Sequence, residues 1–307
     1  MKYRPFGKTG SKVSEIGMGC WAIGGNAYGN SYGPTSDEES IKAIKKAAEL
    51  GCNFFDTADV YGHGRSEELL GAALAGIRKN VFIATKAGGS YMYDENFGHV
   101  NFSGEYMNFA VEQSLRRLRT DYIDVYQLHN PPLHLIREGE VFRPLRDLQK
   151  KGKVRNVGVS VFTLEEGDAA LDHVDCIQCV FNMLDPRKFE LMEEAKRRGV
   201  AVIVREPLAN GFLTGKYGAN SRFDETDIRY RFPPDYIGQM VETVDEIRKG
   251  LSNRNATMAQ LALKYVLAFD SVSTVIPGAK TPQQAEENML ASDMPDMTDE
   301  EMSVLGS

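Results

Sequence analysis

Four side chains that can exchange protons follow short apolar runs in the first half of the chain. They are an acid, a phenol, an amine and an imidazole: Asp56, Tyr61, Lys86 and His129. Each alone has an ordinary interpretation, since an aspartate can cap a turn, a lysine can be a solvated surface charge, and a lone histidine is more often structural. Gathered in one site, they would supply general acid–base catalysis. The fold decides whether the four come together.

Short β-branched or aromatic runs alternate with longer helical patterns along the chain. The predicted strands are Glu15–Met18, Phe54–Asp56, Val81–Thr85, Ile123–Gln127, Val154–Val159, Ile177–Val180, Val200–Val204 and Ser273–Ile276. The predicted helices are Asp37–Leu50, Ser66–Leu74, Tyr106–Leu118, Phe142–Lys150, Leu164–Leu171, Phe189–Arg198, Tyr236–Gly250, Met258–Ala268 and Pro282–Ala291. Such alternation predicts an α/β fold with a parallel sheet covered by helices. Eight units without a break in composition favour one (β/α)8 TIM-barrel domain over residues 1–307, with an open doubly wound sheet as the competing fold.

A barrel would place the proton-exchanging side chains in one site, because barrel active sites lie at the carboxyl ends of the strands. Asp56, Lys86 and His129 each end or follow a predicted strand. Two other features would frame the barrel. Residues 1–13 are predicted to form an N-terminal β-hairpin, and the connections 87–105 and 206–235 are long and rich in aromatic residues. Long connections in compact domains are often lids or binding loops.

Composition limits the class of protein. The chain has 307 residues, of which 42% are apolar and 26% charged, as in globular proteins. A net charge of −7 argues against nucleic acid as the main partner, because phosphate binding needs a basic surface. No run has the length of a transmembrane helix and the N-terminus lacks the apolar core of a signal peptide, so we expect no membrane partner and a cytoplasmic location. Nothing in the sequence indicates an oligomeric state.

Three short motifs resemble ligand-binding signatures without fulfilling them. Gly7-Lys8-Thr9 lacks the upstream glycine of a P-loop, and Gly17-Met18-Gly19 lacks the third glycine of a dinucleotide fingerprint. Cys176 and Cys179 have the spacing of a metal-binding pair, but no second pair is near, and a strand would point them to opposite faces. We therefore predict core cysteines and no metal site.

Seven segments spread over nearly the whole chain carry a recognisable pattern. They are Gly17–Trp21, Asp56–Ala58 with Tyr61-Gly62, Ala84–Lys86, Gln127–His129, Gly158–Ser160, Pro207–Tyr217 and Ile276–Lys280. On these segments, in their order and on matching elements, the sequence resembles the aldo-keto reductase superfamily. The resemblance implies a TIM-barrel oxidoreductase that interconverts aldehydes or ketones with alcohols. It also implies NADP(H), favoured over NAD(H), as cofactor and a small carbonyl or alcohol as substrate.

The resemblance implies a catalytic tetrad of Asp56, Tyr61, Lys86 and His129. Tyr61 would be the proton donor, although a free tyrosine titrates near ~10 and is a reluctant acid–base group at neutral pH. Lys86 beside it would favour the phenolate and lower the pKa of Tyr61. Asp56 would neutralise and orient Lys86, and His129 would donate a hydrogen bond to the carbonyl oxygen.

By the same resemblance, NADP(H) lies extended across the barrel mouth. The residues that would contact it are Cys20, Trp21, Asp56, Ser160, Gln178, Arg205, Leu208, Asn210, Gly211, Lys216, Gly278, Lys280, Gln284, Glu287 and Asn288. Ser160 and Gln178 would lie at the nicotinamide end, and Lys280 would meet a 2′-phosphate as a point charge. The sequence departs from the family pattern twice. Val161 stands where many relatives have asparagine or arginine, and Arg205 stands where an aromatic residue often stacks on the nicotinamide.

The sequence leaves the substrate open among aldehydes, ketoses, sugars oxidised at carbon 1, and quinones. Trp21, Tyr91, Tyr93 and Phe102 would line an apolar substrate pocket above the nicotinamide. Two other classes of protein fit many of the same residues. A cofactor-binding regulatory or redox-sensing subunit, like the potassium-channel β-subunits that resemble aldo-keto reductases, would show little turnover. A barrel lyase or isomerase would use Lys86 as a Schiff-base amine, but the cofactor-binding segments would then have no role.

Overall fold

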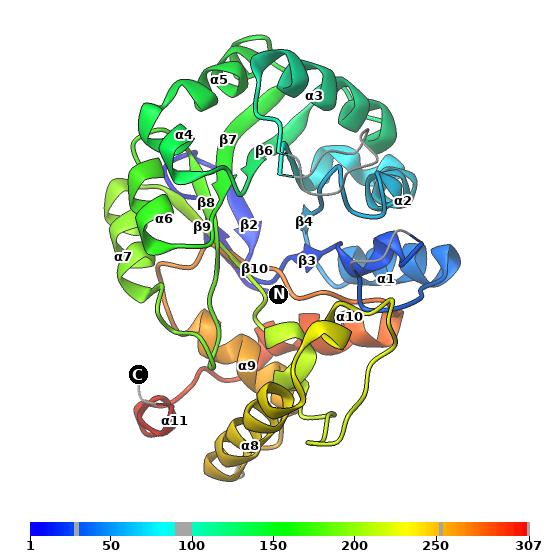
Figure 1. The fold of residues 1–307 in the computed structure, drawn as a ribbon, viewed down its shortest axis with the longest axis vertical. Helices are drawn as coiled ribbons and strands as arrows, with labels where there is room; N and C mark the ends of the chain where they lie inside the picture. The colour runs from blue at the N-terminus through cyan, green and yellow to red at the C-terminus, as the bar shows by residue number, and fades with distance from the viewer. Residues whose placement is uncertain (28–30, 90–99, 252–253, 306–307) are drawn as a thin grey trace.

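Eight parallel strands form the centre of the molecule (Figure 1). The computed structural model describes residues 1–27, 31–89, 100–251 and 254–305. The strands are β3 (Met18–Gly19), β4 (Phe54–Asp56), β5 (Phe82–Ala87), β6 (Ile123–His129), β7 (Val154–Ser160), β8 (Cys176–Val180), β9 (Ala201–Arg205) and β10 (Thr274–Val275). They are hydrogen-bonded in chain order, and parallel bridges from Ile16 to Val275 and from Gly19 to Gly278 join the first strand to the last. The predicted (β/α)8 barrel is therefore confirmed, and the open sheet is wrong.

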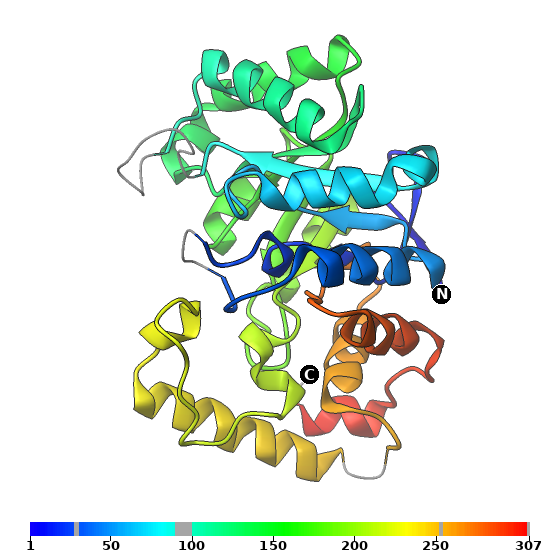
Figure 2. The same ribbon diagram turned by 90° about the vertical axis from the view of Figure 1, so that its right-hand side faces the viewer.

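An antiparallel hairpin closes the amino-terminal end of the barrel. β1 (Tyr3–Pro5) pairs with β2 (Lys12–Ser14), which confirms the predicted hairpin. Phe6 follows β1 and is buried, with its ring centroid 5.8 Å from that of Phe54. Phe6 and Val13 belong to a small apolar cluster with side chains that point into the barrel from the strands. In Figure 2 the hairpin and residues 216–235 lie toward opposite ends of the barrel, so the carboxyl ends of the strands form the open end.

Helices cover the outside of the barrel. They are α1 (Asp37–Glu49), α2 (Arg65–Leu74), α3 (Gly104–Leu118), α4 (Leu133–Glu138), α5 (Arg143–Lys150), α6 (Leu164–Ala170), α7 (Phe189–Arg198), α8 (Pro234–Gly250), α9 (Met258–Leu267), α10 (Pro282–Leu290) and α11 (Asp299–Val304). Hydroxyls of Ser36, Ser103 and Thr163 cap three of them by accepting a backbone N–H of the first turn. Among the helices in the described part of the chain, none has both the length and the apolar character needed to cross a membrane.

The predicted elements are present, with differences at their ends. Each predicted helix begins and ends within two residues of the observed one. The first barrel strand spans Met18–Gly19 rather than Glu15–Met18, because the backbone before Met18 meets β10 only through an isolated bridge from Ile16 to Val275. The helix α4 was not predicted, since its six residues directly after Pro132 are too few for a helical period to stand out.

The four cysteines are free and buried. On β8, Cys176 belongs to the apolar cluster inside the barrel, whereas Cys179 belongs to the larger cluster between barrel and helices. Residues three apart on a strand face opposite sides. The prediction of core cysteines is therefore confirmed.

The connection after β9 is ordered by its aromatic residues. It contains two 3-10 turns, η4 (Ala209–Thr214) and η5 (Ile228–Arg231). The Phe212 ring has the rings of Tyr217, Phe223 and Phe232 around it, with centroids 5.5, 6.3 and 6.2 Å away. The guanidinium of Arg229 lies over Phe223 at 4.6 Å. These contacts hold the connection as a packed wall beside the open end of the barrel.

Candidate active site

A buried ion pair lies at the carboxyl ends of β4 and β5. Lys86 Nζ donates to Asp56 Oδ1 at 2.5 Å and to the Thr57 carbonyl oxygen at 2.8 Å. The side chains of Lys86 and Asp56 are 0% and 3% exposed, so each charge depends on the other for compensation. Burial opposes the ammonium, but the attraction of Asp56 and Tyr61 outweighs it and raises the pKa of Lys86. Lys86 is therefore a cation held in one position.

The Tyr61 phenol lies beside this ion pair. Its oxygen accepts from Lys86 Nζ at 3.3 Å. The turn that carries it is tight, because a Cβ on Gly62 would stand 2.2 Å from the Gly24 carbonyl oxygen, and the φ of Gly62 is +57°. Burial raises the pKa of Tyr61 and outweighs Lys86, which lowers it. The predicted net lowering is therefore wrong: Lys86 acts in the expected direction, but desolvation is the larger effect.

His129, the last residue of β6, faces the Tyr61 ring. The two ring centroids are 5.8 Å apart and the ring planes meet at 82°. Burial, together with the charges of Lys86 and Arg205, holds the pKa of His129 well below its usual range. A neutral imidazole offers one N–H donor and one acceptor nitrogen. Its Nδ1 is buried without a partner among the described residues. The four side chains predicted as a tetrad thus lie in one cluster.

Two glutamines hold the second carboxylate oxygen of Asp56. The Nε2 atoms of Gln178 on β8 and Gln127 on β6 donate to Asp56 Oδ2 at 2.8 and 3.2 Å. The sequence predicts Gln178 only as a cofactor contact, so its bond to Asp56 is an additional role. Gln127 stands in a segment that carries the family resemblance but was assigned no role, although it lies two positions before His129 and shares its face of the strand. The glutamines keep the carboxylate turned toward Lys86.

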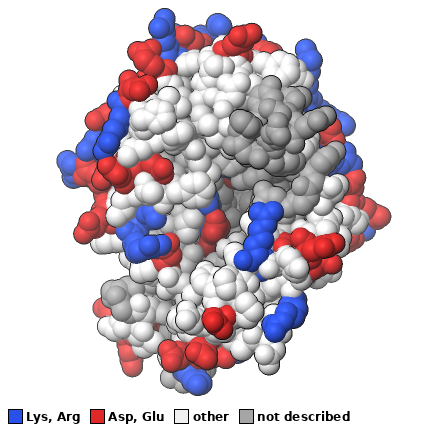
Figure 3. All heavy atoms as spheres, viewed as in Figure 1, with Lys and Arg blue, Asp and Glu red and all other residues white. Residues whose placement is uncertain are grey.

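A cavity of about 460 Å³, which we call the mouth cavity, opens above this cluster. Figure 3 shows the same face of the molecule hollowed near its middle, with charged side chains at the rim. Asp56, Tyr61 and Arg205 line one end of it. The predicted cofactor-contact residues that line the cavity are Cys20, Trp21, Asp56, Gln178, Arg205, Leu208, Asn210, Gly211, Lys216, Gly278, Lys280, Gln284, Glu287 and Asn288. Ser160 does not line the cavity but is buried beside Gln178, its register partner on the neighbouring strand.

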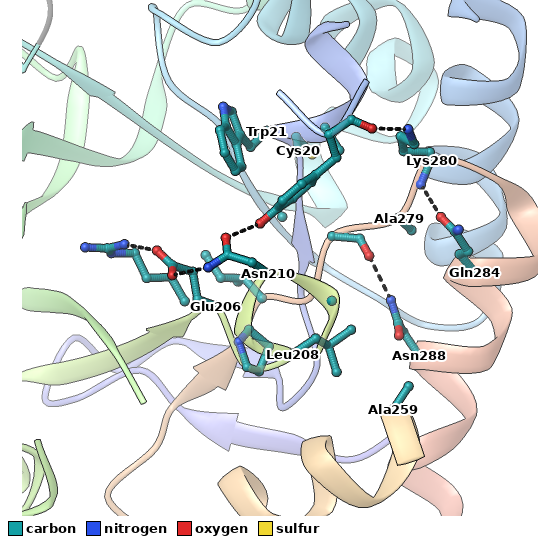
Figure 4. Close-up of a pocket in the computed structure, with 18 of the residues that line it drawn as sticks. Cys20, Trp21, Glu206, Leu208, Asn210, Ala259, Ala279, Lys280, Gln284 and Asn288 are labelled. Carbon is teal, nitrogen blue, oxygen red and sulfur yellow. Dashed lines mark hydrogen bonds and ion pairs between the residues drawn. The ribbon is translucent and has the colours of Figure 1, made fainter. Parts of the chain in front are cut away.

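A chain of polar contacts runs along the mouth cavity (Figure 4). Glu206 pairs with Arg205 and accepts from Asn210 Nδ2 at 3.5 Å. Asn210 Oδ1 accepts from the Tyr32 hydroxyl at 2.7 Å, and the Tyr32 carbonyl oxygen accepts from Lys280 Nζ at 2.7 Å. Sequence analysis missed Tyr32 as a cavity residue, because it stands in a loop without a motif. The contacts tie together three segments far apart in the sequence.

Positive charge gathers at the end of the mouth cavity near α10. Lys216, Arg229 and Lys280 all line it. Arg229 is neutralised by the carboxylate two residues before it, at 2.5 Å. Within the described ranges, Lys280 Nζ contacts only the carbonyl oxygens of Tyr32 and Pro34. Burial and the nearby charge of Arg229 lower the pKa of Lys280. No carboxylate in the described part of the chain forms an ion pair with Lys280, and this end of the cavity therefore suits an anion.

The residues predicted for the substrate pocket separate in the structure. Trp21 lines the mouth cavity, with its ring centroid 6.4 Å from that of Tyr61. Tyr91 and Tyr93 lie outside the described residues. Phe102 is 7% exposed and belongs to the core between barrel and helices, where its ring fills the space beside Gly88. Phe102 is not among the residues that line the mouth cavity, and its place in a substrate pocket stays a prediction.

Fold and cluster together define a class of protein: a (β/α)8-barrel enzyme with a lysine–aspartate pair and a tyrosine at the mouth of the barrel. Comparison with known proteins identifies the family. The model of the Aldo/keto reductase family matches residues 15–307, and the chain belongs to this family. Since aldo-keto reductases use nicotinamide cofactors, the protein is an oxidoreductase of NAD(P)H-dependent carbonyl chemistry.

Its relatives cover nearly all of the chain. It is 34% identical to the aldo-keto reductase YhdN of Bacillus subtilis (strain 168) over 297 residues, covering 93% of this chain and 87% of YhdN. The holo form of aldo-keto reductase AKR11C1 from Bacillus halodurans matches with a TM-score of 0.83 and 30% identity, covering 100% of this chain and 95% of that one. The glycerol dehydrogenase AKR11B4 from Gluconobacter oxydans matches with a TM-score of 0.83 and 29% identity, covering 99% and 94%.

Proposed function

We propose that this protein is an NADP(H)-dependent reductase of small aldehydes or ketones, with Tyr61 as the proton donor. The observation that carries the proposal is the buried Lys86–Asp56 ion pair. Lys86 Nζ lies 3.3 Å from the phenol oxygen of Tyr61, which lines the mouth cavity. A buried ion pair costs more in desolvation than well-packed apolar side chains. An ion pair that lies beside a cavity and a titratable phenol is more easily explained by a catalytic role than by stability.

Each residue of the cluster would have a separate role in proton transfer. The bound nicotinamide cofactor would supply the hydride to the carbonyl carbon. A carbonyl oxygen at Tyr61 would receive one hydrogen bond from the phenol and one from the neutral imidazole of His129. As negative charge develops on that oxygen, the phenol gives up its proton to it. Lys86 stabilises the phenolate that remains, and Asp56 holds Lys86 in place. In alcohol oxidation the phenolate accepts the proton.

The mouth cavity fits an extended dinucleotide. Its inner end holds the proton-transfer cluster, and its other end is basic. Gly211, in the left-handed region at φ +88°, and Gly278 line the cavity without a side chain that would keep a ligand from the backbone. The Nε of Arg205 is buried without a partner among the described residues. Lys280, which forms no ion pair with a described carboxylate, supports a preference for NADP(H), because only this cofactor carries a 2′-phosphate.

Replacing Lys280 with methionine should weaken NADPH binding about tenfold or more and leave NADH binding nearly unchanged. A hydrogen bond to a charged group contributes about 1.5–3 kcal/mol, and about 1.4 kcal/mol corresponds to tenfold in affinity. Titration calorimetry with each cofactor measures the change. Lys249→Met, at an exposed position of α8, is the matched control and should alter neither affinity. Equal weakening of both cofactors would assign the effect to the lost Tyr32 contact rather than to a 2′-phosphate.

Trp21 gives a direct test of the proposed function, because it is the only tryptophan of the chain and lines the mouth cavity. We expect saturable quenching of its fluorescence by NADPH, a weaker response to NADH, and oxidation of NADPH with small aldehydes and ketoses. Glycerol and glyceraldehyde belong in the panel because one structural relative is a glycerol dehydrogenase. Tight binding without turnover would favour a cofactor-sensing subunit, and no binding of either cofactor would overturn the proposal.

A further inference from the structure

Arg205 occupies the end of the mouth cavity that holds the proton-transfer cluster. It is the last residue of β9 and lines the cavity with Asp56 and Tyr61. Its charge lowers the pKa of both Tyr61 and His129, so the guanidinium lies within electrostatic reach of both. Hydride and proton must arrive at the same carbonyl group, and the nicotinamide ring therefore belongs at this end. Arg205 is a cation beside the one part of the cofactor whose charge changes.

Three contacts hold the guanidinium of Arg205. It pairs with the Glu206 carboxylate, donates from Nη2 to the Val161 carbonyl oxygen at 3.4 Å, and lies 5.0 Å from the centroid of the Phe162 ring. Val161 and Arg205 are the two positions at which the sequence departs from the family pattern, and they are in contact.

The Glu206 carboxylate offsets part of the positive charge that Arg205 places at the mouth cavity. Its φ of +55° lies in the left-handed region, which is uncommon for glutamate. Its carbonyl oxygen accepts from Asn182 Nδ2 at 2.9 Å and from the Ala209 N–H at 3.0 Å, which holds this conformation. The side chain of Glu206 is 34% exposed and that of Arg205 is 15% exposed. Water therefore screens the carboxylate more than the guanidinium, and a positive field remains at the proton-transfer cluster.

We propose that the Arg205–Glu206 pair makes this protein bind the reduced nicotinamide cofactor more tightly than the oxidised one. The inference rests on the proposed function. The nicotinamide ring is a cation when oxidised and neutral when reduced, so a nearby guanidinium disfavours only the oxidised form. Glu206 limits the effect. The reduced cofactor then occupies the site in preference to the oxidised one when both are present at similar concentrations.

Two substitutions with opposite expected signs test this inference. Arg205→Gln removes the cation, and the ratio of Kd for NADP⁺ to Kd for NADPH should fall on the order of tenfold. Glu206→Gln leaves the guanidinium uncompensated, and the same ratio should rise on the order of tenfold. Arg205→Lys keeps the charge and should retain most of the original ratio. Both constants are measured by titration calorimetry without a carbonyl substrate, so the result does not depend on turnover.

A distant ion pair provides the control. Arg137 and Glu165 also form an ion pair, but their side chains are 59% and 62% exposed, and Arg137→Gln should leave the ratio unchanged. If both cofactor forms bind and the two site substitutions shift the ratio in the same direction, or not at all, the charge argument is overturned while the proposed function stands. If the unaltered protein binds neither form, the proposed function itself fails.

Discussion

Replacing Tyr61 with phenylalanine is expected to lower carbonyl turnover by about 10²- to 10⁴-fold, the range that a positioned general acid contributes. The substitution removes only the hydroxyl that accepts from Lys86 at 3.3 Å and keeps the ring next to Trp21 and His129. The cavity walls should therefore stay in place, and the Kd for NADPH should change by less than about threefold. Turnover at saturating NADPH and quenching of Trp21 fluorescence measure the two quantities on the same preparation.

Tyr126 provides the matched control for this experiment. It is fully buried, whereas Tyr61 lines the mouth cavity, and the Tyr126 hydroxyl has no hydrogen-bond partner among the described residues. Tyr126→Phe should leave turnover nearly unchanged, which would show that loss of a buried phenol is harmless in itself. If the Tyr61→Phe variant kept more than about a tenth of the original turnover, a loss smaller than general-acid catalysis contributes, the proton donor would have to be another group of the cluster.

The barrel could be predicted from the sequence because local signals mark where several of its helices end. Gly51, Gly152 and Gly199 each follow a helical run, and their φ values of +92°, +77° and +73° are those of helix-ending glycines. With helix ends marked in this way, eight strands could be counted. The side chains that end those strands, such as Asp56 and His129, could then be placed at one face of a barrel.

The residues that form the walls of the mouth cavity could not all be predicted, because some of them meet through contacts between segments distant in the sequence. Tyr32 and Arg229 reach it from irregular segments that meet through backbone bridges of residues 31 and 32 with Asp227. Phe102 illustrates the same limit, because an aromatic residue in a loop can turn toward the core or toward a ligand with the same neighbours in sequence. The pKa of Tyr61 is a further case: its nearest cation was predictable, but the depth of burial that outweighs this cation was not.

Lys86→Met tests two roles of the lysine: compensation of the buried Asp56 charge, which stabilises the fold, and stabilisation of the Tyr61 phenolate, which supports turnover. Asp56, 3% exposed, would lose the cation that pairs with it, which should lower the free energy of unfolding by about 3–5 kcal/mol and Tm by roughly 5–10 °C. Turnover should fall about 10²-fold or more, because the phenolate of Tyr61 loses a charge interaction that can be equivalent to about two pKa units. The pH at which alcohol oxidation sets in should also rise, since Lys86 lowers the pKa of Tyr61.

Lys264 is the matched control for the loss of a buried lysine. It is 1% exposed and pairs with Asp296 at 2.5 Å, but Asp296 is 74% exposed. Removing Lys264 therefore leaves no buried charge, and Lys264→Met should cost less stability than Lys86→Met. Because Lys264 lies outside the proton-transfer cluster, its variant should keep the original turnover and pH profile.

A second substitution in the Lys86→Met background decides between the two roles. Asp56→Asn removes the unpaired charge, and the amide oxygen can still accept from Gln178 and Gln127. We expect the double variant to recover most of the lost stability and none of the lost turnover, as measured by thermal unfolding and steady-state kinetics. A double variant that regained activity would show that Lys86 only supports the fold. One that is stable and inactive would assign Lys86 to proton transfer, because folding would then no longer explain the loss.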